Sequence, residues 1–275
     1  MKKIGFIGAG NMGGALAMAA CRGNGAQEVI LADCATEKAA ALAEKLGCHV
    51  ANSNAEIVQN AQIIMLAVVP QVLDAVLAEI APLLAKLHAA GEQRVVVSMA
   101  GGVSVAALKQ KLGDAQPILR IMPNTPVAIG KGMILLTTGE NKPNIATQKA
   151  MQRFTQAMAA AGIIDVIDES QIEAATVAAG CTPAFAYLFM EALADGAVLT
   201  GLSREKALQY CAQAVLGAAG MVLTTNAHPG ALKDAVCSPG GSTIVGVAAL
   251  EKGGLRSAAI EAVRGAYDKT MEFHS

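Results

Sequence analysis

The chain has 275 residues, with 21 Lys or Arg against 22 Asp or Glu, and aromatic residues make up only 3% of it. This length suffices for about two domains, and the balanced charge and scarce aromatics lead us to expect no nucleic-acid-binding surface. The six cysteines form no Cys-x-x-Cys pair and no secretory signal precedes Ile4, which indicates reduced thiols and a cytoplasmic protein. We expect no metal, because the four histidines lack ligand spacing with acids or cysteines: His49, His88, His228 and His274.

The first half of the chain alternates short apolar runs with alanine-rich helical patterns. The predicted strands are 4–7, 29–32, 63–68, 95–98, 118–122 and 134–136, and the predicted helices are 12–21, 36–46, 71–84, 105–112 and 145–161. Continuous apolar strands that alternate with helices are typical of a parallel sheet covered on both faces. With right-handed crossovers, the pattern predicts an α/β, doubly wound domain over residues 1–164.

The pattern changes after about Asp165, and we expect only helices from there on. They are 170–179, 184–199, 204–223, 232–236, 243–251 and 257–272, with a break from Gly180 through Pro183. These helices are apolar on more than one face, which predicts an all-helical domain over 165–275 that also packs against a partner subunit. The uncharged run 174–190 is near the lower length limit of a membrane span, but its Gly180 and Pro183 favour a buried helix, so we expect no membrane contact.

A glycine-bearing loop follows the first predicted strand. Gly8, Gly10 and Gly13 lie between that strand and a helix, which is the context of a dinucleotide-binding site. Gly8 permits the tight turn, Gly10 lets the backbone approach a pyrophosphate, and Gly13 allows close helix–strand packing. A tight strand–helix turn without a ligand is the alternative interpretation.

Asp33 ends the second predicted strand, twenty residues after Gly13. A carboxylate there binds the ribose 2′-OH of NAD and repels the 2′-phosphate of NADP. No Arg follows closely, so Thr36 and Lys38 are the available phosphate partners. The alternative is that Asp33 only caps the helix that begins near Thr36, which leaves the cofactor choice open.

A second glycine-rich stretch, SPGGST at 238–243, precedes a helical run. Backbone N–H groups at a helix start bind anions, and Ser242 is a suitable N-cap, so a substrate carboxylate would fit there. A glycine-rich turn between helices is the alternative for this stretch taken alone.

The longer run HPGALKDAVCSPGGST at 228–243, followed by Gly246 and Leu250-Glu251, resembles the C-terminal signature of the pyrroline-5-carboxylate reductase family. Further matches along the whole chain are FIGAGNM at 6–12, AVVPQ at 67–71, RIMPNTP at 120–126, EALADG at 191–196 and Gly201-Leu202. The resemblance implies reduction of L-1-pyrroline-5-carboxylate to L-proline by NAD(P)H, the last step of proline biosynthesis. It also implies a Rossmann domain followed by a helical dimerisation domain, homodimers with the active site at their interface, and assembly of dimers into decamers.

The resemblance also implies roles for particular residues. The pyrophosphate is held by Ile7, Gly8, Ala9, Gly10, Asn11 and Met12. The rest of the cofactor is lined by Asn54, Ala67, Val68, Val69, Pro70, Met99, Ala100, Gly101 and Asn124. The substrate carboxylate is held by Ser238, Gly241, Ser242 and Thr243, and the catalytic Thr243 hydroxyl faces the ring nitrogen.

The chain departs from the family pattern at three positions. Val69 stands where the family often has Lys, and Thr182 stands where a Gly is common. Asp33 fits NADH better than NADPH, although the bacterial family is usually described as NADP-linked. Following the family, we expect NADPH as the cofactor; because of Asp33, NADH is an alternative.

Reduction of a cyclic imine explains why neither the glycine loop at 8–13 nor the SPGGST stretch at 238–243 contains a general base. A protonated C=N carbon is already electrophilic, so the protein mainly has to position two reactants and exclude water. A 3-hydroxyacid dehydrogenase of similar architecture would need a catalytic Lys, and the only Lys between Asp165 and Leu232 is Lys206, in a charged helix start. A protein that senses NAD(P) without turnover is the other alternative.

Overall fold

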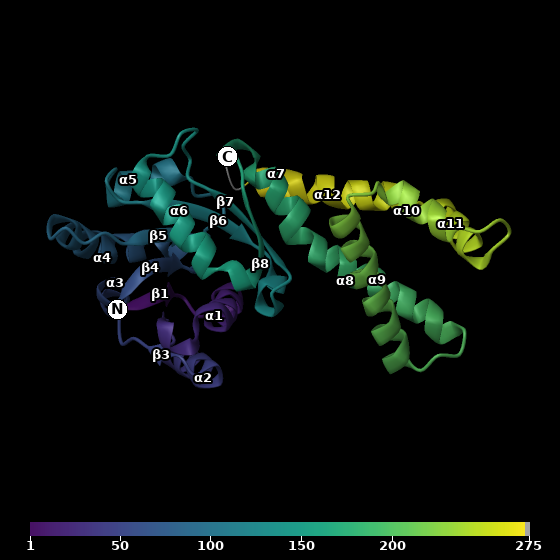
Figure 1. Ribbon diagram of the computed structural model, residues 1–275, viewed down its shortest axis with the longest axis horizontal. Helices are drawn as coiled ribbons and strands as arrows, with labels where there is room; N and C mark the ends of the chain where they lie inside the picture. Colours follow the sequence, from purple (N-terminus) through teal and green to yellow (C-terminus); the bar gives the residue numbers. More distant parts are fainter. Residues whose placement is uncertain (273–275) are drawn as a thin grey trace. The chain divides into compact units, whose positions relative to one another are not determined.

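The computed structural model in Figure 1 describes residues 1–272. Two compact units divide the chain: Met1–Cys181 with residues 269–272, and Thr182–Asp268. The first unit thus extends beyond the expected boundary at residue 164, because α7 (Ile172–Thr176) packs against two of its strands. All six cysteines are free thiols.

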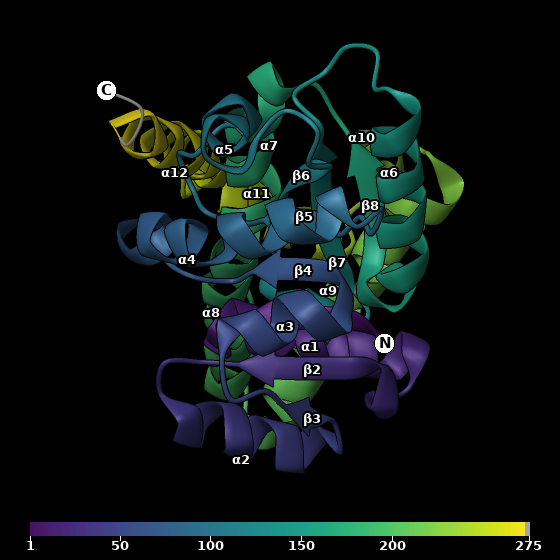
Figure 2. The same ribbon diagram turned by 90° about the vertical axis from the view of Figure 1, so that its left-hand side faces the viewer.

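The first unit is built on one eight-stranded sheet in the order β3-β2-β1-β4-β5-β6-β7-β8. Figure 2 views this sheet and shows β4 between β2 and β5, with β1 between β2 and β4 in the strand order. The strands are β1 (Lys2–Ile7), β2 (Val29–Ala32), β3 (His49–Val50), β4 (Ala61–Leu66), β5 (Val95–Ser98), β6 (Ile118–Pro123), β7 (Gly132–Thr137) and β8 (Gly162–Val166). The order from β3 to β6 is that of a Rossmann fold, which confirms the predicted α/β class.

One strand pair departs from the expected parallel arrangement. β7 is antiparallel to β6, and β8 is parallel to β7. The chain passes from β6 to β7 through a short 3-10 turn at Thr125–Ile129. This connection is too short for the crossover helix that a parallel pair requires.

Helices cover both faces of the sheet, as predicted for a doubly wound domain. One buried cluster includes side chains of α1 (Asn11–Asn24), α2 (Thr36–Leu46) and α6 (Ile145–Ala157). A second cluster includes side chains of α3 (Asn54–Asn60), α4 (Pro70–Ala89) and α5 (Val105–Leu112). α4 buries leucine and isoleucine side chains at helical spacing, Leu73, Leu77, Ile80 and Leu84, which explains why this segment folds as a helix against the sheet.

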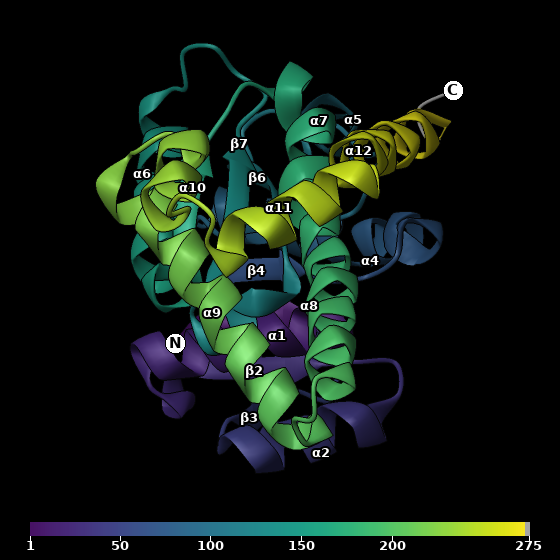
Figure 3. The same cartoon turned by 90° about the vertical axis from the view of Figure 1, so that its right-hand side faces the viewer.

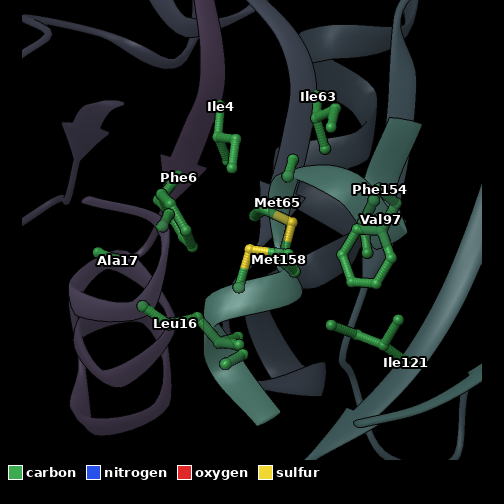
Figure 4. Close-up of a cluster of buried hydrophobic side chains, with 14 of the residues drawn as sticks. Ile4, Phe6, Leu16, Ala17, Ile63, Met65, Val97, Ile121, Phe154 and Met158 are labelled. Carbon is green, nitrogen blue, oxygen red and sulfur yellow. The ribbon is translucent and has the colours of Figure 1, made fainter. Parts of the chain in front are cut away.

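The strands supply alternate side chains to the two clusters. In β4, Ile63 and Met65 belong to the first cluster, whereas Ile64 and Leu66 belong to the second. Figure 4 shows Met65 beside Met158, which follows α6, near the centre of the first cluster. Because both faces of β4 are buried, its sequence is continuously apolar instead of alternating.

Three elements were not predicted from the sequence. β3 has only two residues, and β8 is an exposed edge strand with Ile163 53% accessible, so neither produces an apolar run. The third, α3, did leave a signal, since Ser53 accepts a hydrogen bond from the Glu56 amide at 3.2 Å. That Ser-x-x-Glu spacing is a helix-start pattern.

The second unit contains only helices: α8 (Thr182–Leu199), α9 (Arg204–Thr225), α10 (Pro229–Val236), α11 (Ser242–Lys252) and α12 (Leu255–Met271), whose last residues belong to the first unit. α8 and α9 pack side by side (Figure 3). Among the residues of Thr182–Asp268, only Ala194 and Ala207 are buried, while Leu188 and Leu199 are 69% and 89% exposed. The helical segments Glu169–Leu199 and Arg204–Thr225 are long and apolar enough to cross a membrane. Two such helices are only weak evidence for a membrane protein, because core helices pass the same test.

The expected helix break from Gly180 through Pro183 is wrong. α7 continues through a π-helical turn at Val177–Cys181 directly into α8. The carbonyl of Ala179 has no helical donor four residues later, because Pro183 has no N–H. The Asn124 side-chain nitrogen donates to that carbonyl at 3.0 Å instead, and its Oδ1 accepts from the Met133 amide at 2.8 Å. Asn124 thereby supplies a missing helix bond.

We expect Asn124→Ala to lower the free energy of unfolding by about 1 kcal/mol, because the partly buried Ala179 carbonyl loses its donor. The loss should be smaller in a Pro183→Ala background, where residue 183 regains an N–H for the Ala179 carbonyl. Urea unfolding at fixed protein concentration measures the double-mutant cycle. Equal losses in the two backgrounds would contradict this role of the Asn124 amide.

Candidate active site

The glycine loop lies where the carboxyl ends of three strands meet. The Gly8 amide donates to the Ala32 carbonyl at 2.8 Å, and the Ala67 amide donates to the Ile7 carbonyl at 2.8 Å. These bonds join the ends of β1, β2 and β4. Since β1 and β4 flank the point where the strand order reverses, this is the edge at which open α/β sheets bind ligands.

The three glycines of the loop occupy different steric environments. Gly8 has φ +105°, and a Cβ there would lie 2.3 Å from the Ala67 carbonyl oxygen. A Cβ on Gly13 would lie 2.3 Å from the Gly8 carbonyl oxygen, so these two positions require glycine for packing. By contrast, a Cβ on Gly10 would meet nothing within 4 Å, and its φ of −70° is open to any residue. The space beside Gly10 is therefore available to a ligand.

The first turn of α1 presents free backbone donors beside that space. The helix begins at Asn11, and its N-cap Gly10 makes no side-chain capping bond. The first amides of a helix have no intrahelical partner and carry the positive end of its dipole. This loop therefore fits a phosphate group.

Asp33 is joined to the glycine loop itself. Its Oδ2 accepts from the Ala9 amide at 2.7 Å, and its Oδ1 accepts from the Ala35 amide at 2.9 Å. Burial works to raise the pKa of Asp33, but the two amides, the Cys34 thiol and the Lys38 charge outweigh it and lower the pKa. Asp33 does not cap α2, whose N-cap is Ala35 without a side-chain bond; it orders the loop as an anion.

A crevice of about 390 Å³ opens beside the loop at the same sheet edge. Ten of its lining residues were predicted to bind the cofactor: Gly10, Asn11, Met12, Ala67, Val68, Val69, Pro70, Met99, Ala100 and Gly101. Met122 and Pro123 also line it and were not assigned a role from the sequence. Their place at the carboxyl end of β6 is the signal that could have identified them.

A second cleft, of about 600 Å³, shares Val69, Pro70, Gly101 and Met122 with the crevice. Its other walls include Glu173 and Thr176 of α7, and Thr270 near the end of the chain. Glu173 and Thr176 were not predicted, because no motif distinguishes them in an alanine-rich helical pattern. Through their shared residues, the two cavities are therefore neighbours on the same edge of the sheet.

Six predicted cofactor residues lie outside the crevice lining: Ile7, Gly8, Ala9 and Asp33 in and beside the glycine loop, and Asn54 and Asn124. The last two make other contacts. Asn54, at the start of α3, donates to the Glu79 carboxylate at 2.7 Å. Both amide atoms of Asn124 bind backbone groups, as described above. Their contacts with a cofactor stay predictions. A further cleft, of about 590 Å³, lies beside Thr138 and Asp168 and is lined by none of the predicted residues.

The second glycine-rich stretch forms a turn into α11. Gly240 has φ +68°, and the Gly241 amide donates to the Ser238 carbonyl at 3.0 Å. The N-cap is Gly241, not Ser242 as expected, and it makes no side-chain bond, so the first amides of α11 stay available. A Cβ on Gly241 would lie 2.4 Å from the Ser238 hydroxyl, which places that hydroxyl directly over the turn.

Within residues 1–272, no group of three or more His, Cys, Asp or Glu side chains could hold a metal ion. His274 lies outside the described residues. The crevice is lined by backbone and by uncharged side chains, so it can bind an anion through backbone amides and an apolar ring through aliphatic groups, and its lining offers no titratable side chain.

Comparisons with known proteins agree with this geometry. The family model for pyrroline-5-carboxylate reductase dimerisation matches residues 169–273, and that for NADP oxidoreductase, coenzyme F420-dependent, matches residues 3–102. The pyrroline-5-carboxylate reductase of Escherichia coli K12 is 40% identical over 98% of this chain and 97% of its own length. The Plasmodium falciparum pyrroline carboxylate reductase with NADP bound superimposes with a TM-score of 0.84 at 30% identity, over 100% of this chain and 98% of that one. A Coxiella burnetii pyrroline-5-carboxylate reductase gives 0.83 at 32% identity, over 100% and 99%.

We expect Gly10→Ala to weaken binding of a nicotinamide dinucleotide without lowering the melting temperature, because the added methyl group meets no protein atom and only the ligand space. Gly13→Ala is the matched control. Its methyl group would collide with the Gly8 carbonyl, so the melting temperature should fall. Calorimetric titration and thermal unfolding of both variants measure the two effects. Normal cofactor affinity in Gly10→Ala would contradict the placement of the pyrophosphate.

Proposed function

The chain belongs to the pyrroline-5-carboxylate reductase family, and from this premise we propose how its own residues serve the reaction. The protein reduces the cyclic imine L-1-pyrroline-5-carboxylate to L-proline, the last step of proline biosynthesis, with a nicotinamide cofactor. When bound, the reduced nicotinamide supplies a hydride to the imine carbon. Because the chain belongs to this family, we no longer consider the two alternatives, a 3-hydroxyacid dehydrogenase and a protein that senses NAD(P) without turnover.

The open space at Gly10 is the observation that carries the cofactor assignment. We propose that the pyrophosphate lies against Gly10 and the first amides of α1, within reach of the backbone from Gly8 to Met12. The nicotinamide half then occupies the crevice between Ala67–Pro70 and Met99–Gly101. The largely aliphatic lining favours an uncharged ring and excludes water from the reacting carbon.

We propose that NADPH is the working cofactor. Each Asp33 oxygen already accepts one backbone N–H group, so the carboxylate is engaged in ordering the loop and has fewer lone pairs left for a ribose diol. Lys38 lies close enough to lower the pKa of Asp33, and it stands in the first turn of α2 with Thr36. Its ammonium group and the Thr36 hydroxyl are the partners for a 2′-phosphate.

Substrate binding is assigned to the turn before α11. We propose that the substrate carboxylate accepts hydrogen bonds from the Ser238 hydroxyl and from the amides of Ser242 and Thr243, while the Gly241 amide closes the turn onto the Ser238 carbonyl. The Thr243 hydroxyl, in the first turn of α11, then faces the ring nitrogen and fixes the ring. A protonated imine needs no general base, because the product amine keeps that proton.

We propose that the helical unit pairs with a second copy of this chain instead of with lipid. Thr182–Asp268 buries only two alanines by itself, while α8 carries Glu191 and Asp195 between its apolar residues. The family's dimerisation region covers this unit, which supports pairing between copies. Assembly of dimers into decamers, the absence of nucleic-acid contacts and a cytoplasmic location stay predictions; the six free thiols are consistent with a reducing compartment.

We expect the native chain to oxidise NADPH in the presence of the imine, and Lys38→Met to lower kcat/KM for NADPH by about tenfold, since a charged hydrogen bond to the 2′-phosphate is lost. The value for NADH should not change, because NADH lacks that phosphate. Absorbance at 340 nm measures both, and Lys45→Met, in the last turn of the same helix, is the control. An unchanged NADPH-to-NADH ratio would remove Lys38 from the site.

We expect Thr243→Ala to lower kcat by ~10- to 1,000-fold while the dissociation constant of NADPH stays within about twofold, because a positioned donor at the ring nitrogen is lost. Thr243→Ser keeps the hydroxyl and should retain most of the rate. Steady-state kinetics and fluorescence titration measure the two quantities. Full activity in Thr243→Ala would show that the hydroxyl has no part in the reaction.

A further inference from the structure

Arg120 is a buried cation that lines neither the crevice nor the second cleft. It lies within β6, between Ser98 of β5 and Thr137 of β7, and its side chain is only 3% exposed. The side chain of a central strand normally contributes apolar surface to a core. An arginine at this place therefore requires a specific explanation.

The Arg120 guanidinium joins β6 to the segment that leads into α7. Its Nη1 lies 3.3 Å from the Glu169 carboxylate, and its Nη2 donates to Glu173 Oε1 at 2.6 Å. Glu169 Oε1 also accepts from the Val105 amide, at 2.9 Å, at the start of α5. One side chain thus fixes the first turn of α7 against the sheet and, through Glu169, against α5.

The contacted helix forms part of the second cleft. Glu173 and Thr176 lie three residues apart on α7 and both line that cleft, so they share one face of the helix. Beyond α7, the Asn124 side chain holds the Ala179 carbonyl at 3.0 Å. Arg120 and Asn124 together fix the segment that carries this cleft wall at both of its ends.

Stability alone does not account for Arg120. Removing a guanidinium from water is costly, and apolar side chains of similar volume often replace buried ion pairs without loss of stability. In addition, Arg120 Nε has no hydrogen-bond partner among residues 1–272. A buried group that keeps an unsatisfied donor calls for an explanation beyond packing.

We propose that Arg120 is a positioning residue for imine reduction, which holds Glu173 and Thr176 as the wall that sets the imine ring against the nicotinamide. This inference rests on the proposed function, because the second cleft shares lining residues with the crevice in which we place the nicotinamide, and the imine ring has to lie against the nicotinamide. Arg120 touches neither reactant and acts only through α7. A small displacement of that wall misaligns the ring, and a misplacement of about 1 Å lowers rates by ~100-fold.

The test compares three variants of the full chain: Arg120→Lys, Glu173→Gln and the control Arg94→Lys. Arg94 is likewise buried and binds the Val58 and Gln59 carbonyls and Glu92, but it lines neither cavity. We expect Arg120→Lys and Glu173→Gln to lower kcat/KM for the imine by ~10- to 100-fold while the dissociation constant of NADPH stays within about twofold. Arg94→Lys should lower the melting temperature without changing kcat/KM.

The outcomes separate this inference from the proposed function. A native chain that does not oxidise NADPH with pyrroline-5-carboxylate would overturn the proposed function and, with it, this inference. If the native chain is active, Arg120→Lys with unchanged kcat/KM overturns the positioning role alone. If Arg94→Lys loses as much kcat/KM as Arg120→Lys for a comparable fall in melting temperature, the positioning role is overturned as well. If Arg120→Lys does not fold, the isosteric Glu173→Gln decides by the same criteria.

Discussion

Close backbone packing around Gly8 is the constraint on which the glycine loop and the anion site at the start of α1 depend. The Gly8 Cα stands against the Ala67 carbonyl, and Gly13 stands against the carbonyl of Gly8, at separations that no Cβ would permit. These contacts bring the start of α1 to the ends of β1 and β4 and leave its first amides open. The anion site is therefore a product of backbone geometry, and it needs no charged side chain to form.

The charged side chains of Asp33 and Arg120 lie near the crevice but do not line it. Asp33 accepts from the amide of Ala9, and the Arg120 guanidinium contacts carboxylates outside the crevice. Both ionic groups hold backbone or helix in place, and the cavity walls themselves are mostly aliphatic. Such an arrangement suits a reaction whose substrate already carries the activating proton, because the walls have only to align two rings and keep water out.

Local patterns in the sequence, namely apolar runs, helical spacing and a glycine loop, predicted the doubly wound sheet and most of its helices. Most residues that line the crevice were expected only from the family resemblance. The sequence did not predict β3 and β8, which lack enough buried residues to produce a pattern. The continuation of the helix past Pro183 was also missed, since it depends on Asn124, 55 residues away from Ala179. Glu173 and Thr176 were missed for the same reason: tertiary contacts, not local sequence, bring them to the cleft.

The last residues of α12 have a consequence for the biosynthesis of the chain. Residues 269–272 belong to the first compact unit, and Thr270 contributes to the wall of the second cleft. The ribosome makes the sheet before this wall, so the nascent Rossmann unit cannot complete its cavity until Thr270 has been added. A polypeptide that stops before Thr270 would keep the residues of the cofactor crevice and lack part of the wall of the neighbouring cleft.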